Sequence, residues 1–150
     1  MNHNPILSPA DGKVVALESV PDEAFASGML GEGFAVEPEN GNICAPASGK
    51  VVSVSESRHA YAIAADFGDL LVHVGIDTVN VPEAFDPLVK VGDEVAAGQL
   101  IARADLEMIR GAGLSTVIPV LITDNRTAGE IKIRFGNVRG GEDVALYLTH

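Results

Sequence analysis

The stretch that decides the fold is His59-Ala-Tyr-Ala-Ile-Ala-Ala-Asp-Phe-Gly-Asp-Leu-Leu-Val-His73-Val-Gly-Ile-Asp-Thr-Val79. Two runs rich in alanine and β-branched residues flank a polar break at residues 66–69, which is typical of a β-hairpin. A three-residue loop closed by a glycine would pair Tyr61 with His73. In that register His59 lies diagonal to His73 on the same face, at about 7–8 Å between Cα atoms. We therefore expect the hairpin to bring two histidines together.

A histidine in a strand is more often a half-buried structural residue than a functional one, but two on one face favour a site. We expect no aromatic wall around the pair, and Gly75 removes a side chain beside His73 so that another group can approach. An imidazole titrates near neutral pH and serves as nucleophile, acid, base or metal ligand. Three uses are therefore open: zinc ligation, general base work on a hydroxyl nucleophile, or direct attack by a ring nitrogen.

The rest of the sequence lacks motifs that the first two of these uses would require. A zinc site needs at least three protein ligands, yet the other two histidines lie at the chain ends and no His-Glu-x-x-His motif or cysteine pair is present. Carboxylates would have to complete such a site. The Gly-x-Ser-x-Gly motif of a serine nucleophile is also missing. Direct attack by a ring nitrogen demands least, because the second histidine can donate a hydrogen bond to the incoming group.

The charge excludes some partners. Ten basic against twenty-one acidic side chains give a net charge of −11, which disfavours nucleic acid because phosphate contacts require clustered lysine and arginine. A basic protein partner would instead be attracted. Cys44 is the only cysteine, so no internal disulfide can form. No signal-peptide pattern opens the sequence, and no apolar run approaches the ~18–20 residues that cross a bilayer. We expect a cytoplasmic protein.

Two sequence motifs occur twice. Ser8-Pro-Ala-Asp-Gly-Lys-Val-Val15 recurs as Ala45-Pro-Ala-Ser-Gly-Lys-Val-Val52, and residues 90–96 resemble residues 139–145. Each copy is typical of a glycine-containing turn that leads into a strand. Neither Gly-Lys pair is a phosphate-binding P-loop, because valine stands where serine or threonine should follow.

Short strands dominate the expected secondary structure. Helix is predicted only as one turn at residues 21–25 and as a short helix capped by Asp105 that runs through Arg110. Residues 131–135 alternate between apolar and polar, so one face of that strand should be buried. The sequence predicts one all-β domain over residues 1–150, a barrel-sandwich of mostly antiparallel strands with an internal duplicated motif and little helix. Strands are expected at 14–17, 34–36, 50–54, 117–122, 130–135 and 144–148.

These features together resemble the IIA domain of the glucose family of the bacterial phosphoenolpyruvate-dependent sugar phosphotransferase system. The resemblance runs from about residue 6 to residue 148, and its strongest part is Leu71-Val-His-Val-Gly-Ile-Asp-Thr-Val79, which is similar to the phosphorylation-site signature of the family. Further matching segments are Val20-Pro-Asp22, Gly28-Met-Leu-Gly-Glu-Gly33, Ala45-Pro46 with Gly49, Arg58-His59-Ala60, residues 89–100 and residues 116–120.

The resemblance implies a phosphotransferase component in which His73 accepts a phosphoryl group from the phosphohistidine of the carrier protein HPr. The group would then pass to a cysteine of a IIB domain. His59 matches the second family histidine, which hydrogen-bonds the phosphoryl group. Ser57 stands where the family usually has a threonine and would orient an imidazole. Asp77 and Glu32 match acidic positions that meet a basic residue of HPr.

The resemblance also implies partners and cofactors. HPr and the IIB and IIC permease domains are the expected partners, with the membrane reached only through the permease. No metal or nucleotide is required, because a phosphohistidine donor is already activated. Family members also bind regulatory targets when unphosphorylated, and there His59 and His73 could share a zinc ion with a carboxylate of the partner. One departure is Val81-Pro-Glu-Ala-Phe85, which replaces the usual Lys-Gly-Glu-Gly-Phe and is one residue shorter.

Two rival classes fit less well. Residues 89–98 are similar to the turn of biotinyl and lipoyl carrier domains, but the Met-Lys or Asp-Lys pair of such a carrier is missing. A zinc peptidase on a related β-scaffold would need a third ligand and a His-x-His pair. The alternative that stays open is a regulatory, zinc-bridged binding module without phosphotransfer.

Overall fold

The computed structural model describes residues 3–125 and 129–149. Its largest element is an eight-stranded antiparallel sheet in the order β13-β2-β3-β11-β7-β6-β5-β9. The strands of this main sheet are β2 (Gly12–Ala16), β3 (Glu32–Pro38), β5 (Gly49–Val54), β6 (Ala60–Ala65), β7 (Gly68–His73), β9 (Glu94–Val95), β11 (Ile118–Asn125) and β13 (Gly136–Val138).

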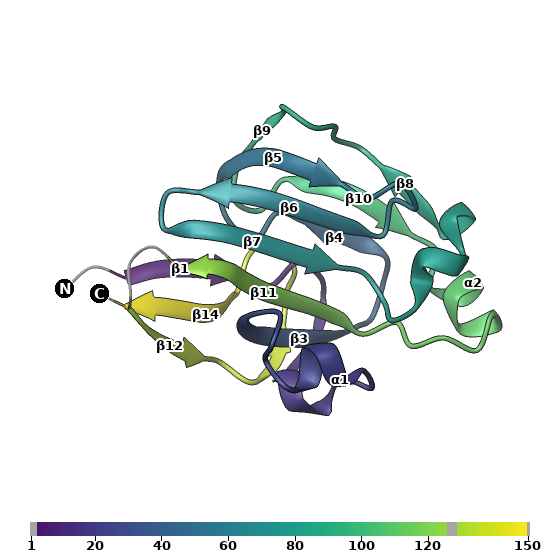
Figure 1. Cartoon of the computed structure of the whole chain (residues 1–150), viewed down its shortest axis with the longest axis horizontal. Coiled ribbons are helices and arrows are strands. Elements are labelled where there is room, and N and C mark those ends of the chain that lie inside the picture. The colour runs from purple at the N-terminus through teal and green to yellow at the C-terminus, as the bar shows by residue number, and fades with distance from the viewer. Residues whose placement is uncertain (1–2, 126–128, 150) are drawn as a thin grey trace.

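Two three-stranded sheets complete the molecule, in the orders β1-β14-β12 and β4-β10-β8. Figure 1 shows that the first and last strands of the chain lie side by side, since β1 pairs with β14. The strands of these sheets are β1 (His3–Leu7), β4 (Asn42–Cys44), β8 (Phe85–Pro87), β10 (Leu100–Ala104), β12 (Glu130–Ile133) and β14 (Val144–Thr149). The all-β class is confirmed, but the three sheets do not close into a barrel over the described residues.

The core lies between the three sheets. Alternate residues of the β6–β7 hairpin point inward and are fully buried, as are those of β14. Aliphatic side chains supply most of this core, and each fully buried one contributes about 1.5–3 kcal/mol. The hairpin is therefore anchored to the core by one face, which leaves its other face available for a site. The largest fully buried side chains of these strands are Tyr61, Ile63, Leu70, Leu146 and Leu148.

A smaller apolar cluster covers part of the opposite face of the main sheet. There η1 (Leu17–Ser19) and α1 (Glu23–Ala26) pack on β3 and β11 through Leu17 and Phe25. Asp22 caps α1 by accepting a hydrogen bond from the Ala24 N–H at 2.9 Å. This confirms the helical turn that the sequence predicts at residues 21–25, and it fixes Phe25 against the sheet.

The second helix, α2 (Leu106–Gly111), also follows the sequence prediction. The Asp105 carboxylate accepts a hydrogen bond from the Met108 N–H at 3.1 Å and caps the helix. Among the described residues no helix is long and apolar enough to span a membrane. Two single 3-10 turns, η2 (Thr78–Asn80) and η3 (Pro82–Ala84), follow β7.

The residue that precedes each copy of the first duplicated motif donates a hydrogen bond to the other copy. The Leu7 N–H donates to the Pro46 carbonyl at 2.8 Å, and the Cys44 N–H donates to the Pro9 carbonyl at 2.7 Å. Each copy then continues into a strand of the main sheet, β2 or β5, which pairs with a short edge strand, β13 or β9. The duplication that the sequence indicates is thus a structural one.

The second pair of similar sequences is not related in the same way. The first residue of each copy of the first motif accepts a hydrogen bond from a glycine. The Gly141 N–H donates to the Ser8 carbonyl and the Gly98 N–H to the Ala45 carbonyl, at 2.8 Å each. Residues 90–96 lead into β9 of the main sheet, whereas residues 139–145 lead into β14 of another sheet. Both are turns that precede strands, as expected, but they are not structural equivalents.

Most of the expected strands form, while the register of the central hairpin differs from the expectation. Ala65 pairs with Gly68 and Ala60 pairs with His73, so the loop has two residues rather than three. The cause is the loop: Phe67 is buried and Gly68, with φ of 149°, already belongs to β7. The strand expected at residues 130–135 ends at Ile133, and Phe135 beyond it is exposed.

Candidate functional site

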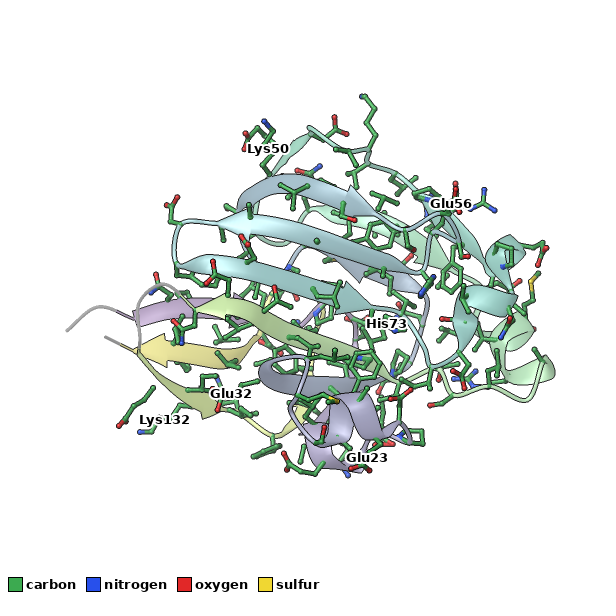
Figure 2. All side chains as sticks on the ribbon, viewed as in Figure 1. Glu23, Glu32, Lys50, Glu56, His73 and Lys132 are labelled. Atoms are coloured by element: carbon green, nitrogen blue, oxygen red, sulfur yellow. The ribbon has the colours of Figure 1, made fainter. Side chains whose placement is uncertain are left out.

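His59 and His73 lie in direct contact, with ring centroids 4.7 Å apart and an interplanar angle of 82° (Figure 2 labels His73, at the end of β7). The observed register would place them on opposite faces of a regular ladder, because the Val74 N–H donates to the His59 carbonyl at 2.7 Å. His59 however precedes β6, directly after Arg58 with φ of 65°. The strand pleat therefore does not set its side-chain direction, and the two rings meet.

Two phenylalanines flank the histidine pair, which corrects the expectation of no aromatic wall. The ring of Phe25 on α1 lies 4.9 Å from that of His73, and the ring of Phe85 at the start of β8 lies 6.3 Å from that of His59, both between centroids. Both phenylalanines are buried. They come from segments far from the hairpin in sequence, and they restrict the rotation of both imidazoles.

Gly75 fixes the tautomer of His73. His73 Nδ1 lies 2.7 Å from the Gly75 carbonyl oxygen, and because a carbonyl only accepts, Nδ1 carries the proton. The lone pair of the neutral ring is then on Nε2. Gly75 has φ of 80°, and a Cβ there would lie 2.4 Å from Thr78 Cγ2, so a larger residue would displace the carbonyl that orients His73.

Ser55 holds His59 in the complementary tautomer. The Ser55 hydroxyl oxygen accepts hydrogen bonds from the N–H groups of His59 and Ala60, at 3.2 Å each, and lies 3.2 Å from His59 Nδ1. With both lone pairs used, the hydroxyl donates its own hydrogen to Nδ1. The proton of neutral His59 is therefore on Nε2. One ring thus has a free lone pair and the other a free N–H.

The serine that contacts His59 in the structure is Ser55, whereas the family resemblance implies that Ser57 orients an imidazole. Among the described residues Ser57 makes no hydrogen bond to either histidine, although it is only two residues from His59. The reason is the tight loop from Ser55 to Ala60, closed by Ser55 N–H to Ala60 carbonyl (3.0 Å) and Arg58 N–H to Ser55 carbonyl (2.9 Å). This loop turns the first serine, not the second, toward the imidazole.

Both imidazoles are neutral near pH 7. Burial lowers the pKa of His59 from 6.5 to about 4, and the adjacent His73 contributes to the same shift. Burial also lowers the pKa of His73, although its hydrogen bond to Gly75 and the carboxylates of Asp22 and Asp77 act in the opposite direction. A neutral imidazole has the lone pair that nucleophilic attack or metal ligation requires.

The acidic residues named from the sequence lie in different places. Asp77 is exposed in the turn after β7 and influences the pKa of His73. Glu32 is exposed at the start of β3, opposite Ile122 of β11, which in turn lies opposite Leu70 of β7. It is thus two strands away from the His73 strand (Figure 2). Asp22, which caps α1, is the second carboxylate near His73, although nothing in the sequence other than its place in the matching segment Val20-Pro-Asp22 links it to the site.

The segment that departs from the family pattern packs beside His59. Arg58 Nη2 donates to the Pro82 carbonyl at 3.0 Å, and the Tyr61 hydroxyl donates to the Arg58 carbonyl at 2.8 Å. Burial raises the pKa of Tyr61 to about 12, so this donor keeps its proton. Within Val81–Phe85, η3 (Pro82–Ala84) leads directly into β8, whose first residue, Phe85, lies beside His59.

Within the described residues no group of three or more histidine, cysteine, aspartate or glutamate side chains converges in a way that could hold a metal ion. His59 and His73 together can supply at most two nitrogen ligands to a metal ion. The arrangement can therefore offer a nucleophilic nitrogen on one ring beside a hydrogen-bond donor on the other. That combination suits the capture of an anionic, electrophilic group.

Comparison with known proteins gives a consistent set of matches. The family model described as the phosphoenolpyruvate-dependent sugar phosphotransferase system, EIIA 1, matches residues 4–128. The PTS system glucose-specific EIIA component of Staphylococcus aureus is 41% identical over 130 residues, which cover 85% of this chain and 78% of that protein.

A multidomain relative and a solved structure agree with this match. The PTS system glucose-specific EIICBA component of Streptococcus pneumoniae is 46% identical over 130 residues, covering 85% of this chain but 18% of that protein. The chain thus spans less than a fifth of that relative. The structure of glucose permease IIA from Mycoplasma capricolum superposes with a TM-score of 0.94 at 32% identity, covering 99% of this chain and 97% of that one.

Proposed function

The chain belongs to the EIIA 1 family of the phosphoenolpyruvate-dependent sugar phosphotransferase system, and we propose that it is a phosphocarrier whose acceptor is His73. The single observation that carries this proposal is the complementary pair of imidazoles, with the His73 Nδ1 proton held by Gly75 and the His59 Nδ1 lone pair occupied by Ser55. His73 Nε2 is then the nucleophile, and His59 Nε2–H is the donor beside it.

The proposed step is a transfer between two nitrogens. His73 Nε2 attacks the phosphorus of a phosphohistidine on HPr, the P–N bond of the donor breaks, and the departing imidazole retains the electron pair. Such transfers depend mostly on positioning and charge stabilisation. His59 supplies a hydrogen bond to a phosphoryl oxygen, and the buried rings of Phe25 and Phe85 exclude water from one side. The donor is already activated, so neither metal nor nucleotide is required.

The phosphoryl group then leaves to a cysteine thiolate of a IIB domain, which attacks phosphorus while the bond to His73 Nε2 breaks. Support for this acceptor comes from the Streptococcus pneumoniae relative, whose name joins IIC, IIB and IIA components in one protein. HPr, IIB and IIC are therefore the proposed partners, and Asp22 and Asp77 beside His73 offer carboxylates to a basic partner residue. A cytoplasmic location follows from such partners, with the membrane reached through the permease.

A second candidate function is a regulatory binding module in which the unphosphorylated pair shares a zinc ion with a partner. Two neutral imidazoles in contact favour it. Zinc would bind His73 Nε2 directly, while His59 would have to move its proton to Nδ1, and Ser55 could accept that proton in a hydrogen bond only by giving up one of its two backbone N–H donors. A carboxylate of the partner would have to complete the coordination, because zinc takes four ligands.

The experiment that tests the phosphocarrier proposal is intact mass after incubation with phosphoenolpyruvate, enzyme I and HPr at alkaline pH, where phosphohistidine survives. We expect one acid-labile phosphate on the wild type and none on His73→Ala. His59→Gln should still accept phosphate but pass it to a IIB domain more slowly, because it lacks the imidazole N–H.

If the His73→Ala variant still gained phosphate at the full rate, His73 would not be the acceptor. Normal transfer by His59→Gln would remove His59 from the mechanism. If a well-folded wild type gains no mass, zinc titration with a candidate partner tests the regulatory function instead.

A further inference from the structure

A groove of about 430 Å³ lies between β12 and the segment that contains η1 and α1, apart from the histidine pair. Leu17, Ala26, Ile131 and Ile133 give it an apolar lining, and Gly28 and Gly33 add backbone without side chains. Its volume is within the range of about 300–1,000 Å³ that is usual for binding pockets. None of its lining residues contacts the histidine pair, although Glu32 among them is an acidic position that the family resemblance places against HPr.

The β12 strand has an unpaired edge within the described chain, and two of its residues line this groove. Among the described residues β12 pairs with β14 alone. The Arg134 N–H donates to the Ala145 carbonyl at 2.8 Å, so this pair is hydrogen-bonded. Because hydrogen-bonded and non-hydrogen-bonded pairs alternate in an antiparallel ladder, the N–H and carbonyl groups of Ile131 and Ile133 point away from β14. These are the two β12 residues that line the groove.

The side chains of the groove specify which residues it would accept. Ile131 and Ile133 are partly buried against the main core, so they form a firm apolar surface. Glu18 and Glu32 are both exposed and line the same groove. Neither forms an ion pair with another described residue, and the chain as a whole has a net charge of −11. The groove therefore offers two carboxylates beside an apolar floor.

We propose that this groove binds an extended segment of a partner protein, which pairs with β12 as an added strand and carries alternating apolar and basic side chains. An added strand satisfies the outward N–H and carbonyl groups of the edge. Its apolar side chains pack on the groove lining from one face, and the basic side chains of its other face remain near the surface, where the exposed carboxylates of Glu18 and Glu32 attract them. A second copy of this chain is disfavoured as the occupant, because pairing two β12 edges would bring the same carboxylates together.

The test uses a fluorescein-labelled peptide, acetyl-Lys-Val-Lys-Val-Lys-Val-Lys-amide, and fluorescence anisotropy with the whole chain. We expect saturable binding that Glu18→Lys and Glu32→Lys each weaken by about tenfold, since each change removes an attraction and adds a repulsion. Glu107→Lys, which makes the same change of charge on α2, an element that does not line the groove (Figure 1), is the matched control and should weaken binding by less than about twofold.

Amide hydrogen exchange supplies the second readout. Binding should slow exchange of the outward N–H groups of Ile131 and Ile133, while exchange of the β14-paired N–H of Arg134 should change little. Ile131→Pro removes one outward donor without removing a bond to β14, and it should abolish this binding. The binding assay does not involve His73, so its outcome is independent of the proposed phosphotransfer.

Three results would overturn the proposal. Absence of saturable binding at millimolar peptide would exclude the groove as a docking site. Equal weakening by Glu107→Lys would show that only the net charge attracts the peptide. A dimer in sedimentation that Ile131→Pro dissociates would assign the edge to a second copy of this chain.

Discussion

Single hydrogen bonds decide which nitrogen of each histidine carries a proton. His73 donates from Nδ1 to a carbonyl, whereas His59 accepts at Nδ1 from a hydroxyl. If a donor replaced the Gly75 carbonyl, Nε2 of both rings would carry a proton. If an acceptor replaced the Ser55 hydroxyl, Nε2 of both rings would have a lone pair. The function of the pair therefore depends on Gly75 and Ser55 as much as on the imidazoles.

The role of Ser55 can be separated from that of Ser57 by matched alanine variants. Ser55→Ala leaves two backbone N–H groups without their acceptor, so we expect a loss of about 1–3 kcal/mol in the free energy of unfolding. Because the His59 ring also loses the hydrogen bond that orients it, phosphoryl transfer should slow by about tenfold, equivalent to ~1.4 kcal/mol. Urea denaturation, the ¹⁵N shifts of the His59 ring and the transfer rate measure these effects.

Ser57→Ala is the control, since this serine makes no hydrogen bond to the histidines within the described chain. Its stability and its ring shifts should match those of the wild type. A larger effect of Ser57→Ala than of Ser55→Ala would contradict the assignment.

The lowered histidine pKa values predict the pH dependence of stability. In the unfolded chain His59 takes up a proton below pH 6.5, while in the folded chain it stays neutral until about pH 4. The unfolded state thus binds more protons in this window, and the free energy of unfolding should fall as pH falls from about 6.5 to 4. His73 contributes in the same direction.

Urea denaturation at several pH values checks this dependence. His59→Gln cannot take up the proton, so its stability should decline less over the same pH range. An equally steep decline in that variant would assign the effect to other groups.

At the scale of elements, the turn after β7 joins the site to the fold. The Gly75 N–H donates to the Val117 carbonyl at 2.9 Å, and the buried Thr78 hydroxyl donates to the Val74 carbonyl at 2.6 Å. The same turn places Asp77, with φ of 61°, beside His73. A change of backbone in this turn would therefore alter both the tautomer and the electrostatic surroundings of His73.

Gly75→Ala and Gly113→Ala form a matched pair for this turn, because their φ angles are 80° and 79°. A Cβ at Gly113 meets nothing within 4 Å, so only the left-handed backbone penalty of about 1 kcal/mol applies there. At Gly75 the Cβ would also collide with Thr78, and we expect a loss of about 2–4 kcal/mol. Urea denaturation compares the two, and equal losses would show that the turn relaxes.

At the scale of the whole molecule, the net charge of −11 bears on how partners approach. An acidic protein attracts a basic partner over a distance that salt shortens. We expect phosphoryl transfer from phospho-HPr to slow by about tenfold between low salt and about 0.5 M salt. Stopped-flow measurement of the transfer rate checks this, and a rate independent of salt would show that contact chemistry alone governs the encounter.

Much of the fold could be predicted from the sequence. The apolar runs predicted most of the strands, a turn at residues 21–25 and the cap Asp105 marked the two helices, and the signature around His73 indicated the family that the comparisons confirm. The hairpin register was wrong by one residue, because the loop could not be distinguished from a three-residue one by its composition.

The sequence by itself determined what depends on residues close together in the chain: the strands, the helix caps and the pairing of a histidine signature with a turn glycine. Only the tertiary structure decided which serine contacts His59, which phenylalanines flank the pair, and that Glu32 lines a groove beside β12. The physical reason is how far apart in the sequence the interacting residues lie. Backbone conformation and capping follow from local spacing, whereas these contacts join segments that only the packing of the sheets brings together.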